Sequence, residues 1–181
     1  SGAGDFTEIQ LAIDSLSVAD GDEVVVKDGT YFEHVNFNQK DILLRSENGA
    51  GTTIIDGGAS GDVVSIVNNE QAPTELRGFT ITNGNIGINL FNGVSLTIAD
   101  CIISNHSRGM HVTSNCVITV VNCEIKDNNL TSHGNVAGAG IRVENSEILL
   151  GDCSINGNQA ICTNSGGNPS KAEGGGIFAL N

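Results

Sequence analysis

Several side chains with useful chemistry recur at one position of a repeated motif. The motif Gly-(Ile/Met)-x-(aliphatic) occurs as GINL at 87, GMHV at 109, GIRV at 140 and, slightly shifted, GIFAL at 176. Its third position holds Asn89, His111, Arg142 and Phe178. An imidazole can transfer protons near neutral pH, a guanidinium can bind a carboxylate, and a phenyl ring offers an apolar face for stacking. We expect these four side chains to form an outward-facing column.

Two longer segments beside this column carry further candidates. Residues 128–138 contain His133, and residues 158–174 contain Lys171 and Glu173. Loops on a repeated scaffold are common positions for binding sites. The sequence therefore predicts a shallow substrate-binding surface made of His111, Arg142, His133, Lys171, Glu173, Asn89 and Phe178. The alternative is that these are solvated side chains on an exposed β-face. No catalytic residue is assigned.

A second repeat contains cysteines, in the stretches LTIADCIISN, ITVVNCEIKDN and ILLGDCSINGN. One column holds Phe79, Cys101, Cys123 and Cys153, at intervals of 22, 22 and 30 residues. Aliphatic residues precede it by three positions (Leu76, Ile98, Val120, Leu150) and follow it by two (Ile81, Ile103, Ile125, Ile155). We interpret the cysteines as small buried apolar residues. A disulfide between neighbours in the column is the alternative.

The residues immediately before this column are Gly78, Asp100, Asn122 and Asp152. Asp100 and Asp152 could be interpreted as paired catalytic carboxylates. However, Gly, Asn and Asp are the residues that best tolerate a left-handed backbone conformation. A sharp bend between two strands explains the whole column, so we predict a structural role for it.

Fixed-period self-similarity indicates a solenoid, and the alternation of apolar residues within each unit indicates strands. A repeat of 22 residues is too short for strand–helix–strand units. We therefore predict an all-β, single-stranded parallel β-helix with three strands of three to five residues per coil. It would form one domain over residues 1–181, with a helical cap at 1–20, first coils at 21–73, and regular coils with lengthening loops at 74–181.

The amino-terminal stretch predicts a capping α-helix. Phe6, Ile9, Ala12, Ile13 and Leu16 have helical spacing, and Asp5 or Thr7 could cap the start. Such a helix would cover the core and strand edges at the end of the solenoid. At the other end the chain stops after a Gly-Ile motif. We expect either that it is the amino-terminal part of a longer β-helix or, if complete, that it forms a homodimer through residues of about 150–181.

The composition limits the partners. Eight basic and 21 acidic residues give a net charge of −13, which argues against nucleic acid and anionic membranes. No apolar run reaches the ~20 residues that a membrane span needs. Asp- and Asn-rich turns allow Ca²⁺ binding, but no D-x-D-x-D-G run is present, and we assign no cofactor or metal site.

The stretches GDFTEIQLAID, GDEVVVKDGTYFEHVNF, DILLRSENGAGTTIIDGG and LRGFTITNG together resemble right-handed parallel β-helix proteins of the pectin lyase-like superfamily. This superfamily includes pectin methylesterases, polysaccharide lyases and surface or periplasmic β-helix proteins. The DGTY-x-E element is shared by enzymes and non-enzymes, and GGGIFALN is similar to repeats of autotransporter passenger domains. The resemblance implies a right-handed coil and an extracellular, cell-surface or periplasmic location.

The motifs that carry catalysis in pectin methylesterases cannot be found in this chain, which also has no Trp. We therefore expect an extracellular scaffold or carbohydrate-contacting module without a recognisable complete catalytic site. The alternative is a polysaccharide-active enzyme of the lyase, pectin esterase or epimerase type that acts on acidic glycans.

Overall fold

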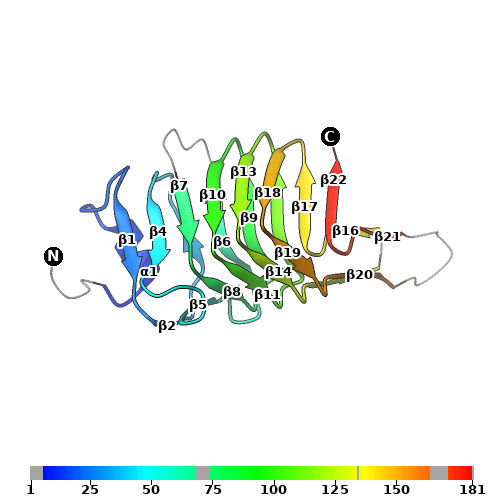
Figure 1. Cartoon of the computed structure of the whole chain (residues 1–181), viewed down its shortest axis with the longest axis horizontal. Coiled ribbons are helices and arrows are strands. Elements are labelled where there is room, and N and C mark those ends of the chain that lie inside the picture. The colour runs from blue at the N-terminus through cyan, green and yellow to red at the C-terminus, as the bar shows by residue number, and fades with distance from the viewer. Residues whose placement is uncertain (1–5, 68–73, 134, 164–170, 181) are drawn as a thin grey trace.

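The computed structural model describes residues 6–67, 74–133, 135–163 and 171–180 and shows a parallel β-helix. Its coils lie side by side along the long axis of the molecule, with the helix α1 (Ile9–Asp14) at the amino-terminal end (Figure 1). Each regular coil contributes one strand to each of three long sheets, in which every pairing is parallel. The predicted fold class is confirmed.

Sheet A contains β1 (Glu23–Val26), β4 (Leu43–Ser46), β7 (Thr74–Arg77), β10 (Ser95–Ala99), β13 (Val117–Val121) and β18 (Glu147–Gly151). Sheet B contains β2 (Gly29–Tyr31), β5 (Thr53–Asp56), β8 (Thr80–Thr82), β11 (Ile102–Ser104), β14 (Glu124–Lys126) and β19 (Ser154–Asn156). Sheet C contains β3 (Val35–Asn36), β6 (Asp62–Val67), β9 (Ile86–Phe91), β12 (Arg108–Thr113), β17 (Ile141–Glu144) and β22 (Ile177–Leu180).

Two small sheets interrupt this regular pattern. They pair β15 (Asn129–Ser132) with β20 (Gln159–Cys162) and β16 (Val136–Ala137) with β21 (Ala172–Glu173). Both lie in the segments that the sequence predicted as lengthening loops. The prediction was incomplete, because the extra residues of one coil pair with those of the next and so form strands.

The bend between sheets A and B has the conformation that the repeat predicted. Gly78, Asp100, Asn122 and Asp152 have φ values of 76°, 56°, 50° and 51°. After the bend, the thiols of Cys101 and Cys123 are buried and that of Cys153 is half-buried. All five cysteines of the chain are free thiols. The interpretation of this column as small buried residues is therefore confirmed for its first two cysteines and holds in part for the third.

The capping helix is shorter than the sequence predicted. It ends at Asp14, so Leu16 lies beyond it and is fully exposed, and Phe6 lies before it and is 42% exposed instead of facing the core. Ile9, Ala12 and Ile13 form its buried face. Its short length follows from the small area that it has to cover, since it packs mainly on β1 and β3.

The start of α1 is stabilised by a carboxylate from the first coil. The oxygens of Glu33 accept hydrogen bonds from the backbone N–H groups of Ile9 and Gln10, both at 2.9 Å. Thr7 is not the N-cap residue, because Glu8 occupies that position, and Asp5 lies outside the described residues. Free N–H groups at a helix start favour a negative charge. The DGTY-x-E element thus has a structural role through its glutamate.

A buried polar column runs between sheets B and C. The side chain of Asn128 accepts a hydrogen bond from the backbone N–H of His106 at 3.0 Å and donates one to the carbonyl of Ile103 at 3.3 Å. Asn158 repeats both contacts one coil later, with the N–H of Asn128 and the carbonyl of Ile125. Each amide thereby satisfies two backbone groups that would otherwise be buried without partners.

His106 occupies the equivalent position one coil earlier and makes the same two kinds of contact. Its Nδ1 accepts from the N–H of Gly84 at 3.0 Å, and its Nε2 lies 3.0 Å from the carbonyl of Ile81. Only the neutral imidazole with hydrogen on Nε2 can accept at one nitrogen and donate at the other. Burial lowers the pKa of His106 and so favours this neutral form.

We expect His106→Asn to make the fold less sensitive to acid. Because the folded-state pKa of His106 is lowered, the unfolded chain binds more protons, and stability falls as pH drops below the unfolded-state value of about 6.5. Each unit of pKa difference costs about 1.4 kcal/mol once both states are protonated. Asparagine can make the same two contacts in the polar column but does not titrate. The free energy of unfolding of the variant should therefore fall less between neutral and acidic pH than that of the wild type.

The measurement is urea unfolding at about pH 7.5 and about pH 5.5, where histidine titrates. His133→Asn is the matched control, since it makes the same substitution at an exposed histidine outside this polar column. An equal decline in wild type and His106→Asn would show that His106 does not cause it.

Candidate functional site

The candidate site lies on the outer face of sheet C. Asn89, His111, Arg142 and Phe178 are in register on the neighbouring strands β9, β12, β17 and β22. The register pairs Arg142 with Phe178 directly, so the last motif is not shifted as the sequence suggested. Strand alternation places these side chains outside, because Met110, Val112, Ile141 and Val143 between them are buried. The column exists, and its role in binding stays a prediction.

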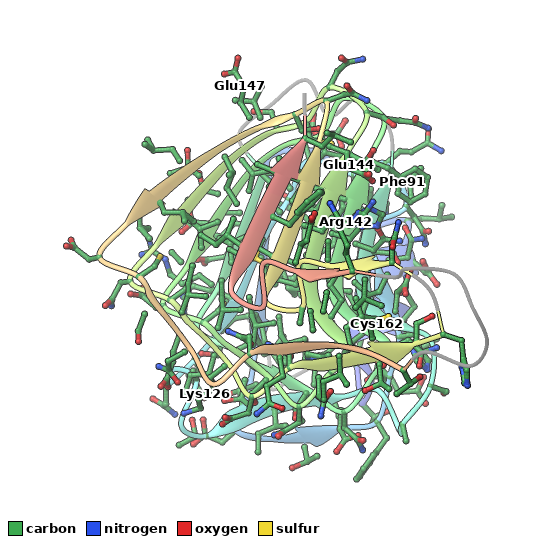
Figure 2. All side chains as sticks on the ribbon, turned by 90° about the vertical axis from the view of Figure 1, so that its right-hand side faces the viewer. Phe91, Lys126, Arg142, Glu144, Glu147 and Cys162 are labelled. Atoms are coloured by element: carbon green, nitrogen blue, oxygen red, sulfur yellow. The ribbon has the colours of Figure 1, made fainter. Side chains whose placement is uncertain are left out.

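Glu144 connects the central members of this column. Its Oε1 accepts a hydrogen bond from Nη2 of Arg142 at 2.6 Å, and its Oε2 lies 3.3 Å from Nε2 of His111. The Arg142 guanidinium lies 5.4 Å from the centre of the Phe178 ring, a cation–π contact. Seen from the carboxyl-terminal end, Arg142, Glu144 and Phe91 are on the same side of the coil (Figure 2).

Sequence analysis did not identify Glu144, although a signal for it exists. It follows Arg142 by two positions in the same strand and therefore points to the same face. Its partner His111 is on the adjacent coil, where the register places Thr113 opposite Glu144 and Arg142 opposite His111. The contact is thus diagonal between strands, and only the known register shows it.

Hydrogen bonds, burial and neighbouring charges shift the pKa values of Glu144 and His111. The hydrogen bond from Arg142 and the second one from His111 lower the pKa of Glu144 to about 2. Burial lowers the pKa of His111, and the nearby charges of Arg108 and Arg142 lower it further, while Glu144 opposes this shift. These shifts favour a carboxylate at Glu144 and a neutral imidazole at His111 near neutral pH.

Arg108 is a second residue that the sequence analysis missed. It begins β12 and donates through Nε to the carbonyl of Gly138 at 3.0 Å and through Nη2 to that of Ala137 at 3.3 Å. Its pKa is lowered by burial and by the charge of Arg142. Arg108 thus attaches β16 to the outer face of sheet C and adds a positive charge beside His111.

Gly138 permits this close contact. It has a φ of 66°, and a Cβ atom there would lie 2.9 Å from Cβ of Arg142. A larger residue would therefore meet both backbone strain and a steric clash. β16 and Gly138 are consequently held against the column and form one side of the candidate site.

The remaining candidates lie on the two small sheets. His133 is exposed between β15 and β16. The side chains of Lys171 and Glu173 are 77% and 50% exposed, and Nζ of Lys171 lies 3.8 Å from Oε1 of Glu173. Within the described part of the chain, no hydrogen bond or ion pair joins these three side chains to His111 or Arg142. Asn89 is in the column, but its amide donates to Asp62 at 2.7 Å. The structure therefore groups His111, Arg142 and Phe178 with Arg108 and Glu144.

Two hollows in the described part of the chain lie away from this face. One of about 370 Å³ lies between α1 and the first coil and is lined largely by apolar residues such as Phe6, Val24 and Val26. Another of about 310 Å³ follows the bend between sheets A and B. The candidate site is instead part of a sheet face, a shape that suits an extended ligand better than a small enclosed one.

Among the described residues, no cluster of three or more His, Cys, Asp and Glu side chains could hold a metal ion. The expectations about cofactors and Ca²⁺ stay predictions. Within the same part of the chain, α1 is too short and too polar to cross a membrane.

Comparison with known proteins gives one match. The family model described as "Right handed beta helix region" matches residues 15–177, and it confirms the predicted handedness. Neither the search of curated proteins nor the search of solved structures found a match.

We expect Glu144→Gln to lower the pKa of His111. The carboxylate is the group that favours imidazolium here, and its removal leaves burial and two neighbouring guanidinium charges, all of which favour the neutral ring. NMR titration of the histidine ring protons measures the change. Glu147→Gln, on sheet A, is the control and should have no effect. An unchanged or increased His111 pKa in Glu144→Gln would contradict the coupling.

Proposed function

The chain belongs to the right-handed β-helix family, and on this premise we propose that it is a scaffold whose sheet C presents a carbohydrate-contacting surface. The surface comprises Arg108, His111, Arg142, Glu144 and Phe178, with Phe91 at its edge. We further propose that the protein acts outside the cytoplasm, at the cell surface or in the periplasm, because of the superfamily that its sequence resembles.

The observation that carries the proposal is the position of Arg142 between Glu144 and Phe178. The hydrogen bond of 2.6 Å and the ring contact of 5.4 Å hold the guanidinium against the phenyl face. The Arg142 side chain has therefore already lost conformational entropy before a ligand binds, and this lowers the entropic cost of binding. Sugars present both hydroxyl groups and apolar C–H faces, so a fixed polar group beside an aromatic ring matches both.

The arrangement also suits a chain of several sugars. Phe91 and Phe178 are half-buried on β9 and β22, two strands that lie three spacings apart, or about 14 Å at about 4.8 Å per spacing. Phe91 is also displaced by two residues along the strands, because Asn89 is the β9 residue in the row of Phe178. His111 and Arg142 lie on the two strands between them. An extended glycan that crosses the strands would thus meet a ring, polar groups and a second ring in succession.

We expect Phe178→Ala to weaken glycan binding about fivefold, because an aromatic contact of this kind contributes on the order of 1 kcal/mol. Arg142→Ala should weaken it at least as much, since it removes the donor and frees Glu144. A glycan array identifies a ligand, and calorimetry measures its affinity for each variant.

Phe32→Ala is the matched control, because Phe32 is 76% exposed but precedes β3 and lies outside this surface. Its affinity should equal that of the wild type. If Phe32→Ala weakens binding and Phe178→Ala does not, or if no glycan binds, the proposal is wrong.

A second function is favoured by the charges of the same group. An enzyme that eliminates across a uronic acid needs a base for the proton next to the carboxylate and a cation to stabilise the resulting negative charge. Burial lowers the pKa of His111 and so favours the neutral ring, which can accept a proton. Both hydrogen bonds that Arg108 makes within the described part of the chain go to backbone carbonyl groups. This would make the protein a lyase on acidic glycans.

For this second function we expect acidic polysaccharides to yield unsaturated products, which absorb ultraviolet light. His111→Ala should then lower the rate by about a hundredfold or more, as general base catalysis commonly contributes that much. Arg142→Ala should raise the KM. Binding without any turnover by the wild type would favour the scaffold, and turnover that His111→Ala leaves unchanged would exclude this assignment.

A further inference from the structure

Three thiols are stacked at the bend between sheets A and B, away from the candidate glycan surface. Each makes the same local contact, with the carbonyl two residues earlier: Cys101 with Ala99 at 3.2 Å, Cys123 with Val121 at 3.2 Å and Cys153 with Gly151 at 3.3 Å. Because the flanking strands pair in register, successive thiols belong to residues about 4.8 Å apart. That separation lies within the range that a disulfide can bridge.

The first two thiols form a distinct pair. The backbone N–H of Cys101 donates to Sγ of Cys123 at 3.4 Å, so the Cys123 side chain is directed toward the earlier coil. Both cysteines line the hollow of about 310 Å³ that follows the bend, together with Asp100, Asn122 and Glu124. Cys153 is not one of its lining residues. The Cys153 thiol also points toward the earlier coil, with Sγ 3.4 Å from the carbonyl of Val120, so it is access through the hollow that selects Cys101 and Cys123 over Cys123 and Cys153.

The two thiols also differ in acidity. The hydrogen bond with Cys101 lowers the pKa of Cys123, whereas burial raises the pKa of Cys101 well above its usual range. Cys123 is thus the better source of a thiolate, and the thiolate is the form that reacts with oxidants. Both side chains are at most 3% exposed, so only a very small oxidant can reach them through the hollow.

We propose that Cys101 and Cys123 are an oxidation site that hydrogen peroxide converts into a disulfide between adjacent coils. The Cys123 thiolate attacks one peroxide oxygen, the O–O bond breaks, and hydroxide leaves and takes up the thiol proton as water. This gives a sulfenic acid on Cys123. The sulfur of Cys101 then attacks that of Cys123, the S–O bond breaks, and a second water leaves with the Cys101 proton.

The product joins two coils at their bend without contacting sheet C. By closing a loop of chain, the bond restricts the unfolded state and stabilises the folded one. The reaction goes beyond the proposed glycan function, and either can fail without the other.

The test uses the folded wild-type protein treated with hydrogen peroxide and then alkylated, digested and mapped by mass spectrometry. We expect a peptide pair linked through Cys101 and Cys123, with a mass lower by two hydrogen atoms and a loss of two titratable thiols. A rise in thermal midpoint that a reducing agent reverses should accompany it. Cys153→Ser should give the same crosslink, and Cys123→Ser should not.

Three outcomes would overturn the proposal: all thiols remaining alkylatable, a link between Cys123 and Cys153, or oxidation of Cys123 to sulfinic acid without a crosslink. Circular dichroism before treatment shows that each variant has folded. The wild-type map decides the question even if a variant does not fold.

Discussion

The structure depends on one constraint, the in-register parallel stacking of each coil on the previous one. Residues one repeat apart lie directly above one another, as Ile98 lies between Leu76 and Val120 in sheet A. Each interior side chain therefore packs against the equivalent side chain of the next coil, and the solenoid core consists of columns of similar side chains. The cysteine column is one such case, since it occupies a corner next to a left-handed bend.

The same constraint explains how polar groups can be buried. At the corner between sheets B and C, Asn128 and Asn158 each use one amide to satisfy two backbone groups of the preceding coil. His106 can replace an asparagine because its two ring nitrogens provide the same acceptor and donor. The replacement introduces a group that titrates near neutral pH, so the column gains a sensitivity to acid that an asparagine would not have.

How much the sequence predicts follows from this repetition. The columns of Cys101 and of Arg142 could be aligned without a structure, and this alignment also predicted the strands, the bends and the outward-facing positions. Glu144 and Arg108 could not be found in this way, because their contacts are a diagonal pair between coils and a bond to a non-repeated segment. The length of the capping helix was overestimated, because Phe6 and Leu16 continue its helical spacing in the sequence. In the structure both side chains are exposed, so there is no core at these positions for a longer helix to cover.

Insertions at one corner add new surface without disturbing the repeat. The interval from Cys123 to Cys153 is eight residues longer than the 22 before it, yet Glu124 and Ser154 still pair in register. The extra residues form β15 and β16, which pair with β20 and β21 of the next coil and so follow the same stacking rule. Arg108 then attaches β16 to sheet C beside His111 and Arg142. The repeated coils fix where the outward column lies, and the inserted segment determines what surrounds it.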